Sequence, residues 1–545
     1  MRVLKSFLIT GLIATAIVGC KSVSSIPVPK GVDNTVVISA KKVPLTKDEK
    51  KSWGHADLAT DTIPGMSLAK AYQFLAGKKG VEVVVGVVDS GTDLKHQDLK
   101  ANAWVNKKEI PNNGKDDDKN GYVDDINGWN FLGAIYKENY ESDRILMNPK
   151  LVDDATYKEI KAAFDKKVAS AKTNKSRFNQ MLQGVEFADK TIATYLKKKD
   201  YTKDDVAAIK TEDANLKQSV NIAMQMYGFG LTSLSQAINE IKKEIKKADD
   251  LVSGKTLKTD YRKELGDDAN DFSTKFYGDN KSGHTTKDEA HGTHVSGIIG
   301  AIRNNNVGMN GVANNVKIMA VRAVPDGDEY DKDVALAIRY AVDNGAKVIN
   351  TSFGKAYSPH KQWVWDAIKY AAEKDVLIVN AAGNDAKDID VEKTYPNDSK
   401  DLKTEIADNV ITIGASTYNY NEKLPASFTN YGKLNVDIFA PGYQIYSTTP
   451  EDEYQYFSGT SMAAPSTAGV AALIRSYYPK LSASQVKHIL MNSGTKINID
   501  VTKPGSASRA NPKGIKVPFA KLSVTGRVVN AYNALKMAEK MVNGK

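Results

Sequence analysis

Hydrophobic and polar positions follow two different patterns along this chain. Residues 51–131 and 282–545 contain short runs of consecutive apolar residues, which alternate with stretches where apolar residues recur every three or four positions. Residues 132–281 are rich in lysine and poor in glycine and proline, and their apolar residues follow the helical period. Because consecutive apolar residues are typical of buried strands and a period near 3.6 is typical of helices, the patterns predict two kinds of structural unit.

The two outer segments predict an α/β fold. The apolar run 81–88 is interrupted only by Glu82 and Gly86, as is typical of a strand that is buried on both faces of a parallel sheet. Strands and helices that alternate in this way form doubly wound, mainly parallel sheets flanked by helices. Further strands are predicted at 316–324, 347–350, 376–380 and 410–414, and helices at 66–75, 333–344, 363–374, 470–478 and 528–542.

The middle segment predicts an inserted all-α subdomain. Its apolar residues form a stripe on each expected helix, so each helix would bury that stripe and expose its other faces to solvent. Residues 132–281 are therefore expected to divide the α/β domain into a first part, 51–131, and a second part, 282–545. Two of these stripes are Tyr157, Ile160, Phe164 and Val168, and Leu234, Ile238, Ile241 and Ile245.

The first residues of the chain predict export and lipidation. A basic start precedes the apolar run 7–18, which is too short to span a bilayer comfortably and is typical of a signal peptide. The run ends in I-V-G-C at Cys20, which is similar to the lipobox of bacterial lipoproteins. The chain has no other cysteine, so no intramolecular disulfide is possible, and a lipidated cysteine is favoured over an incidental one.

From this resemblance we expect a lipoprotein signal peptide in 1–20, a lipid on Cys20 and a tether in 21–50, which is rich in Ser, Val, Pro and Lys. The lipid would hold the exported protein to a membrane of the bacterial cell envelope, on its periplasmic or outer surface. No later segment is apolar enough to predict a transmembrane helix.

Composition and charge narrow the class of protein further. The chain of 545 residues is 41% hydrophobic and 26% charged, which is typical of globular domains. Its formal net charge is +10, but the lysines that supply the excess are spread along the chain and do not cluster with aromatic residues. This distribution indicates a solvated basic surface, and we expect a monomer that binds no nucleic acid.

Four short segments carry the groups that acyl transfer requires, which are a nucleophile, a base, a residue that orients the base and donors for an oxyanion. Ser461 opens a predicted helix among small residues, and Asp89 ends a buried strand where α/β folds place their sites. His291 lies among glycines, and Asn384 follows a strand and carries an amide donor. The four segments are 87–93, 291–297, 380–384 and 459–465.

Each of these residues has a simpler interpretation when it is taken alone. Asp89 or Ser461 could cap a helix, and Asn384 could belong to a turn. His291 and His294 could be an incidental pair or metal ligands. Only the presence of all four segments in one chain favours catalysis over these alternatives.

Together the four segments resemble the subtilisin (S8) family of serine peptidases. The sequences D-S-G, H-G-T-H-V-S-G and G-T-S-M-A-A-P match the three signatures of that family almost letter for letter, and they follow one another in its order. The resemblance covers about 53–131 and 282–538, with the insert between them. Supporting segments are 345–354, Tyr395-Pro396 and 439–442.

The resemblance implies a serine endopeptidase that cleaves protein or peptide substrates through an acyl-enzyme. Ser461 would attack the carbonyl, His291 would transfer the proton, and Asp89 would orient His291. Asn384 and the backbone N–H of Ser461 would form the oxyanion hole, and His294 would be structural. The segments that match substrate-binding regions are Ser352, Phe353 and Gly354, which would pair with an extended substrate, and Ala381, Ala382 and Gly383, which would line the pocket for the residue before the cut.

Two further positions follow from the same resemblance. Asp385 falls where the family can place a residue at the rim of that pocket, and an acid there would favour Lys or Arg before the cut. Tyr395-Pro396 matches a cis peptide bond of the family.

The acidic segment 116–125 predicts a calcium site. Oxygen-bearing side chains at alternate positions around a glycine follow the ligand pattern of an EF-hand-like loop, although no glutamate follows at the twelfth position and no paired helices are evident. Without a cation these carboxylates would repel one another, which favours structural Ca²⁺ over a solvated acidic turn. A weaker candidate, Asp98 with loop 304–309, matches the family's first calcium site by position. The ligands expected in the first segment are Asp116, Asp118, Asn120, the Tyr122 carbonyl, and Asp124 or Asp125.

Two departures from the family bear on function. Residues 21–50 are too few for the folded prodomain with which many subtilisins are made. The insert separates Asp89 from His291, so it should emerge near the active-site face and either cover one side of the cleft or remain a distant stabilising appendage. A different class of function is a catalytically silent binding or scaffold protein with this fold, against which the intact catalytic residues argue. A third possibility is a maturation protease that cuts one partner.

Overall fold

The computed structural model describes residues 40–544. The predicted signal peptide, Cys20 and residues 21–39 of the predicted tether lie outside this range. Within the rest of the predicted tether, helix α1 (Lys47–Ser52) begins with a reciprocal capping box between Thr46 and Glu49. The ordered domain therefore begins several residues earlier than residue 51, because a local capping signal outweighs the polar composition of this segment.

The segment after α1 packs onto the α/β domain. Trp53, in a 3₁₀ helix η1 (Trp53–His55), is buried, and its indole Nε1 donates a hydrogen bond to the Tyr443 carbonyl over 3.1 Å. Two short helices follow, α2 (Leu58–Asp61) and α3 (Leu68–Leu75). The predicted helix at 66–75 is thereby confirmed, two residues shorter at its start.

Within the described residues, a nine-stranded sheet in the order β10-β13-β7-β6-β5-β4-β1-β3-β2 forms the centre of the domain. Every neighbouring pair is parallel except β10 with β13, so the predicted mainly parallel sheet is confirmed. The strands are β1 (Val83–Asp89), β2 (Gly128–Asn130), β3 (Val316–Arg322), β4 (Val348–Thr351), β5 (Leu377–Ala381), β6 (Val410–Ser416), β7 (Ile438–Pro441), β10 (Thr495–Lys496) and β13 (Arg527–Val528).

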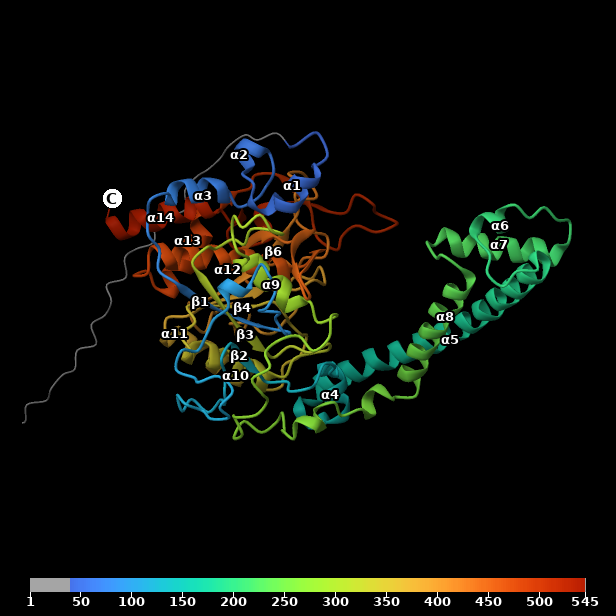
Figure 1. The fold of residues 1–545 in the computed structure, drawn as a ribbon, viewed down its shortest axis with the longest axis horizontal. Helices are drawn as coiled ribbons and strands as arrows, with labels where there is room; N and C mark the ends of the chain where they lie inside the picture. Colours follow the sequence, from blue (N-terminus) through green and yellow to red (C-terminus); the bar gives the residue numbers. More distant parts are fainter. Residues whose placement is uncertain (1–39, 545) are drawn as a thin grey trace, which may run out of the picture.

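Helices cover both faces of this sheet (Figure 1). Helices α10 (Asp331–Asp343) and α11 (Lys361–Glu373) share a buried cluster with one face. The other face packs against α3 and four further helices, namely α9 (His291–Gly300), α12 (Thr460–Tyr477), α13 (Ala483–Ser493) and α14 (Ala531–Asn543). Two hairpins flank the sheet, β8 (Ile445–Thr449) with β9 (Glu453–Phe457), and β11 (Asp500–Thr502) with β12 (Lys516–Pro518).

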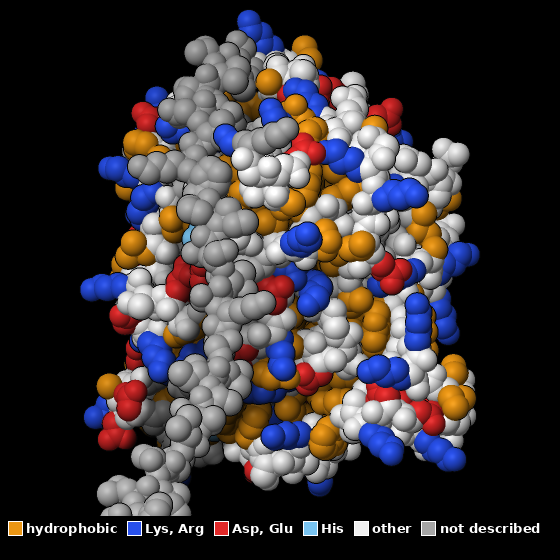
Figure 2. Space-filling model, turned by 90° about the vertical axis from the view of Figure 1, so that its left-hand side faces the viewer, with side chains coloured by type: hydrophobic (Ala, Val, Ile, Leu, Met, Phe, Trp, Pro, Cys, Tyr) orange, Lys and Arg blue, Asp and Glu red, His pale blue; other side chains and the backbone are white. Residues whose placement is uncertain are grey.

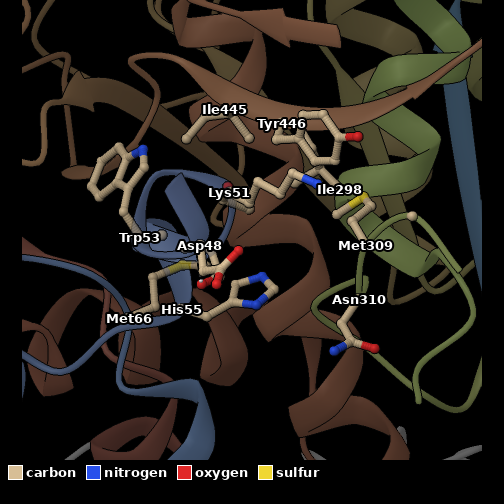
Figure 3. A pocket seen from close by; sticks show the side chains of 14 residues that line it. Asp48, Lys51, Trp53, His55, Met66, Ile298, Met309, Asn310, Ile445 and Tyr446 are labelled. Carbon is tan, nitrogen blue, oxygen red and sulfur yellow. Dashed lines mark hydrogen bonds between the residues drawn. The ribbon is translucent and has the colours of Figure 1, made fainter. Parts of the chain in front are cut away.

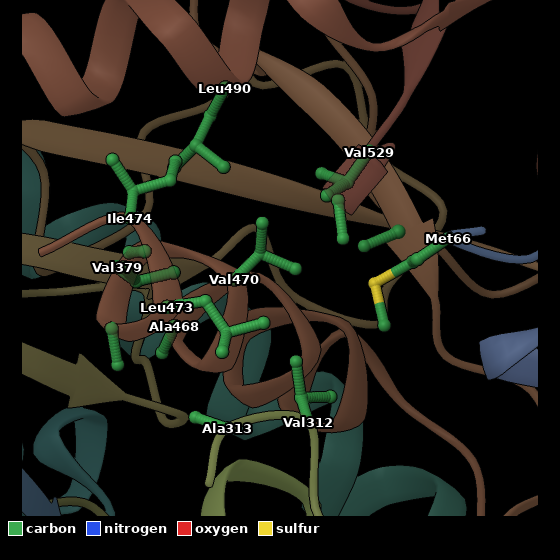
Figure 4. Close-up of a cluster of buried hydrophobic side chains, with 14 of the residues drawn as sticks. Met66, Val312, Ala313, Val379, Ala468, Val470, Leu473, Ile474, Leu490 and Val529 are labelled. Atoms are coloured by element: carbon green, nitrogen blue, oxygen red, sulfur yellow. The ribbon is translucent and has the colours of Figure 1, made fainter. Parts of the chain in front are cut away.

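Helix α12 is the centre of the larger buried cluster. Figure 4 shows Val470, Leu473 and Ile474 of this helix among side chains from β5, the neighbouring loops and α13. The prediction of a helix at 470–478 covered only its second half. The first half carries small residues and Pro465, so it has no stripe of large apolar residues from which a helical period could be inferred.

The predicted insert is helical. After α4 (Glu141–Met147) and the 3₁₀ helix η3 (Pro149–Leu151), a 43-residue helix α5 (Asp154–Leu196) runs out from the body beside α8 (Leu234–Val252), as Figure 1 shows. Helices α6 (Lys203–Ala207) and α7 (Ala214–Gly228) lie at the far end of this arm, where they share a small buried cluster with α5 and α8. Helices η4 (Thr256–Lys258) and η5 (Arg262–Leu265) lead back to the body.

The root of the insert is attached to α10 by buried ion pairs. Arg262 donates to both carboxylate oxygens of Asp333 over 2.8 Å and to Asp267 over 2.7 Å. Lys332, which is fully buried, also binds Asp267. These charges are desolvated and mutually paired, which is the condition under which buried ions are tolerated.

On the face of the molecule in Figure 2, lysine and arginine side chains are scattered among acidic and uncharged ones and do not gather into one patch. In the part of the chain that the structure describes, no helix has the length and apolar character that a membrane span requires.

Candidate active site

The sheet brings two of the four predicted segments, 87–93 and 380–384, and the supporting segment 345–354 to one edge. Asp89 is the last residue of β1, Ser352 directly follows β4, and Ala381 is the last residue of β5. The parallel register pairs Val88 with Thr351 and Thr351 with Asn380. Because the carboxyl ends of parallel strands meet at the same edge, residues from these segments lie side by side although the sequence separates them widely.

The structure brings Asp89 and His291 into contact. They are 202 residues apart, yet His291 Nδ1 lies 2.7 Å from Asp89 Oδ1 at the start of α9. Asp89 is fully buried, and its Oδ1 also accepts the Ser90 N–H over 2.8 Å. A side chain at Gly292 would place its Cβ 2.4 Å from the Ser90 carbonyl oxygen, so the glycine after the histidine permits this close approach.

Asp89 sets the protonation of His291. Burial alone lowers the pKa of the imidazole, but the charge of Asp89 and its hydrogen bond outweigh burial and raise the pKa above its ordinary value. About a third of the His291 side chain remains exposed (38%), so it can reach a ligand from the solvent side.

His294 has a different environment. Its Nε2 lies 3.1 Å from the carbonyl oxygens of Ile445 and Gln455, and its ring stacks on Phe457 with centroids 4.3 Å apart. Burial lowers its pKa to about 3. The side chain is fully buried and its Nε2 faces two carbonyl groups, which fits a structural role and does not fit a metal site shared with His291.

Ser461 is held by two hydrogen bonds to Ser352. Pro465 lies in the second turn of α12 and has no N–H, so the Ser461 carbonyl four residues earlier lacks its helical partner. The Ser352 hydroxyl donates to that carbonyl over 2.9 Å, and the Ser461 hydroxyl donates to the Ser352 carbonyl over 3.1 Å. The proline of G-T-S-M-A-A-P therefore frees the acceptor that connects α12 to the end of β4.

Asn384 and the Ser461 N–H converge on one point. Asn384 Oδ1 accepts from the backbone N–H and the hydroxyl of Thr460 over 2.8 and 3.0 Å, which turns its Nδ2 donor the other way. A methyl group at Gly459 would lie 3.5 Å from both Asn384 Nδ2 and the Ser461 nitrogen. Two N–H donors that surround one small space are the arrangement that an oxyanion hole needs.

A cleft of about 560 Å³ lies over these residues. It contains most of the residues that the sequence predicted for substrate binding, but not Ser352, whose side chain is buried beneath it. The predicted cis bond at Tyr395-Pro396 is confirmed, and this dipeptide also lines the cleft. The predicted residues in its lining are Phe353, Gly354, Ala381, Ala382, Gly383, Asn384, Asp385 and Ser461.

Two features of the cleft have no simple sequence signal. Asn430 is fully buried and holds the loop after β5, because it accepts the N–H groups of Asp385 and Lys387 and donates to the Ala382 carbonyl over 2.8 Å. The insert also contributes to the lining, through Tyr140 and two further residues. Both depend on contacts between segments far apart in sequence, which periodicity does not reveal.

A second cavity of about 240 Å³ lies between the N-terminal segment and the body. Figure 3 shows Asp48 and His55 close together in it, while Lys51 extends toward Tyr446, whose ring centroid is 4.9 Å from the ammonium. Burial and the nearby charge of Arg303 lower the pKa of His55 to about 3. None of the predicted site residues lines this cavity.

A buried ion pair stands behind the catalytic loops. Arg322, beside Asp89 in the sheet register, donates through Nε to Glu289 Oε1 over 2.6 Å, and the same oxygen accepts the Gly91 N–H over 3.0 Å. Arg322 also donates to Asn130 Oδ1 and to the carbonyls of residues 133 and 135, where the chain enters the insert. One guanidinium thus connects the loops of Asp89 and His291 with the root of the insert.

The acidic loop gathers a different set of carboxylates from the one predicted. Asp116 and Asp118 meet Glu109, and single oxygen atoms of the three lie within 4.8 Å of one another. Among the described residues these three acids form no ion pair with Lys or Arg. Glu109 lies seven residues before the predicted segment, so no spacing rule within that segment pointed to it.

The other predicted ligands have other partners. Asp124 accepts the N–H groups of Asn113 and Gly114, and Asp125 accepts the Tyr340 hydroxyl over 2.6 Å. Burial raises the pKa of Asp125 to about 6, against the effect of its hydrogen bonds. In the same loop, the Asn120 side chain caps the N–H of Tyr122 and donates to Asp125, and the Tyr122 ring is buried.

At the weaker candidate, the fully buried Asp98 accepts hydrogen bonds from Asn305, from the Met309 N–H and from the Tyr454 hydroxyl. Loop 304–309 does lie against Asp98, as the sequence predicted. Donors surround the carboxylate, and Asp98 belongs to no group of three or more acids, histidines or cysteines that could share an ion within the described residues.

We predict that Arg322→Met lowers the free energy of unfolding by about 3–5 kcal/mol, because it leaves Glu289 buried without its cation. Urea unfolding measures this change. Arg177→Met, at an exposed position on α5, is the matched control and should change stability by less than about 0.5 kcal/mol. Equal effects of the two variants would contradict a special role for Arg322.

Comparison with known proteins gives the family. The sequence matches the subtilase family of peptidases over residues 80–511. It is 43% identical to a thermophilic serine proteinase of Bacillus sp. (strain AK1) over 187 residues, which are 34% of this chain and 42% of the relative. It is 36% identical to subtilisin DY of Bacillus licheniformis over 219 residues, which are 39% of this chain and 73% of the relative.

Among solved structures, the chain is similar to a cold adapted subtilisin-like serine proteinase. The alignment covers 44% of this chain and 74% of that proteinase, with 29% sequence identity and a TM-score of 0.33. The family match includes all four predicted segments, and the strands and helices around them form the sheet described above. The chain therefore belongs to the subtilase family.

Proposed function

We propose that this subtilase is a serine endopeptidase that hydrolyses peptide bonds of protein or peptide substrates through an acyl-enzyme on Ser461. The observation that carries the proposal is the 2.7 Å contact of His291 Nδ1 with the buried Asp89. A cleft that contains Ser461 and Asn384 supports it. A histidine oriented by a buried carboxylate presents its other nitrogen as a base. Family membership supports the same activity.

In the proposed reaction, Ser461 Oγ attacks the peptide carbonyl while its proton passes to His291 Nε2. The carbonyl oxygen becomes negative and accepts from Asn384 Nδ2 and the Ser461 N–H. The C–N bond then breaks, and the proton on His291 goes to the leaving amine. Water then hydrolyses the acyl-enzyme: its oxygen bonds to the acyl carbon while its proton passes to His291. The bond between that carbon and Ser461 Oγ breaks, Oγ takes the proton from His291, and the acid product leaves.

The Ser461 hydroxyl must turn for this reaction, because it now donates to the Ser352 carbonyl. Hydrogen bonds of catalytic groups often become productive only when substrate is bound. Asp89 keeps Nδ1 of His291 engaged meanwhile, so the tautomer with a free Nε2 is ready to receive the proton.

We predict that Ser461→Ala abolishes labelling by a fluorescent fluorophosphonate and peptide hydrolysis. Asn384→Ala should retain the nucleophile but lower kcat by about 10²–10³, because one oxyanion donor is lost. Ser176→Ala, at an exposed position on α5, is the control. Labelling of Ser461→Ala equal to that of wild type would show that another residue reacts and would overturn the proposal.

The raised pKa of His291 predicts the pH profile. The base must be neutral, so kcat/KM should fall as the pH falls through a midpoint above the ordinary histidine value of about 6.5. Asp89→Asn removes the charge that raises this pKa, so the midpoint should move down, and kcat should fall by about 10⁴. Profiles from about pH 5 to about pH 9 test this, and a midpoint unaffected by Asp89→Asn would contradict it.

We further propose that Glu109, Asp116 and Asp118 hold a structural Ca²⁺. Their oxygens are the hard ligands that calcium prefers, and a cation would relieve the repulsion among three carboxylates that have no basic partner in the described part of the chain. Bound calcium would tie residue 109 to the loop that follows it. The ion has no part in the proposed chemical steps.

Calcium should therefore raise thermal stability. When its free concentration is about 100 times Kd, an ion that binds only the folded state adds about 2.7 kcal/mol to the free energy of unfolding. We expect a chelator to lower the Tm of the wild-type protein. In Glu109→Gln, the Tm measured with calcium and the Tm measured with chelator should differ less than in wild type. Glu212→Gln, at an exposed position in the insert, is the control. A Tm that is independent of calcium would reject the site.

We also propose, from the sequence alone, that Cys20 carries a lipid and that the protein is held to a membrane of the bacterial cell envelope. The apolar run before this sole cysteine supports the proposal. Such an anchor would keep the peptidase close to the surface at which it meets its substrates.

A further inference from the structure

The base of the insert forms one wall of the substrate cleft. Tyr140, Ser142 and Lys167 line the same cleft as Ser461, and Ser142 and Lys167 belong to α4 and α5. The contact between insert and body continues beside the cleft, where the Tyr357 hydroxyl donates to Glu159 of α5 over 3.5 Å. The first turns of α5 thus lie against the cleft. Helices α6 and α7 lie at the other end of the arm, away from the body (Figure 1).

The acidic side chains in the cleft are offset by their neighbours. Asp328 and Asp385 are the aspartates that line it. Asp328 accepts the Glu141 N–H over 2.8 Å and lies in the field of the buried Lys355. Asp385 lies near Lys387 and contributes to raising the pKa of that lysine. Asp385 forms no ion pair within 4 Å among the described residues, and the expectation that it favours Lys or Arg directly before the cut stays a prediction.

Two of the four lysines in the lining are themselves paired. Lys355 binds Glu141 over 2.7 Å and Asp331 over 2.9 Å, so it is neutralised within the protein. Lys387 binds Glu392 over 3.0 Å. Each of these two lysines is therefore balanced by a carboxylate outside the lining of the cleft.

The other two lysines are not balanced in this way. Lys167 and Lys393 line the cleft, and neither forms an ion pair within 4 Å in the described part of the chain. Lys167 acts on the half-buried Asp143 without forming such a pair with it, and its ammonium lies 6.0 Å from the centroid of the Tyr140 ring. Both ammonium groups are therefore available to a substrate, one from the insert and one from the body.

We propose that Lys167 and Lys393 select substrates that carry an acidic side chain in the segment before the cleaved bond. The proposal rests on the endopeptidase function proposed above and adds its substrate class. The insert would thus be a specificity element: its first turns supply a cation to the cleft, and the family fold supplies the catalytic groups. An ion pair at a partly exposed site contributes up to about 1 kcal/mol of interaction free energy. For each lysine this corresponds to a factor of about 5 in kcat/KM between acidic and neutral substrates.

The test uses the full chain and peptides that differ only in having Glu, Gln or Lys at each of about four positions before the cut. For the wild-type protein we expect kcat/KM for the Glu peptide to exceed kcat/KM for the Lys peptide by about 5-fold or more at one or more of these positions. The ratio of the two kcat/KM values should decrease as salt is added. Lys167→Glu or Lys393→Glu should reduce or invert this ratio while hydrolysis of the Gln peptide continues. Lys172→Glu, at an exposed position farther along α5, should leave the ratio unchanged.

The outcomes separate the two proposals. Equal kcat/KM for Glu, Gln and Lys peptides, or a preference for Lys, would overturn the charge selection but leave the peptidase proposal intact. A preference for Glu that survives both charge reversals would assign it to other residues and reject the role of these lysines. Fluorophosphonate labelling without hydrolysis of any peptide would overturn the endopeptidase function and this inference with it.

Discussion

The active site depends on the buried contact between Arg322 and Glu289. In the sequence, the insert separates the strand that ends in Asp89 from the helix that begins with His291. In the fold, His291 Nδ1 nevertheless lies 2.7 Å from Asp89 Oδ1. Arg322 lies beside Asp89 in the sheet and binds the loop before His291 as well as the entry to the insert. Because these charges have no access to water, their geometry is restricted, and a large helical arm can be added without displacing the catalytic pair.

A second constraint acts from the serine side of the cleft. Pro465 leaves the Ser461 carbonyl without a helical partner, and the Ser352 hydroxyl takes that place. The start of α12 is thereby fastened to the end of β4, while the rest of the helix is buried in the core beneath (Figure 4). Core packing sets the position of α12, and the two hydrogen bonds between Ser461 and Ser352 hold the start of this helix and the Ser461 side chain in place.

The insert has two parts with different relations to the catalytic body. Its distal helices share a small core of their own and extend away from the cleft, which agrees with an appendage (Figure 1). Its root is ion-paired to α10 and lines the cleft, which agrees with a role in substrate selection. The two hypotheses that the sequence left open would each apply to a different segment, because a long helix such as α5 can contact the cleft at one end only.

The sequence by itself determined the α/β class, the helical insert and the residues that we propose for catalysis, because local periodicity and short motifs indicate all three. Apolar runs specified β1 and β3 to β6, and the motif around Ser461 pointed to the nucleophile although the helix that carries it was only half predicted. Tertiary structure alone decided which acids meet. Glu109 joins Asp116 and Asp118, whereas Asp125 turns to Tyr340. It also brought Lys167 to the cleft, since contacts across more than a hundred residues depend on how separate elements pack, and no local pattern records that packing.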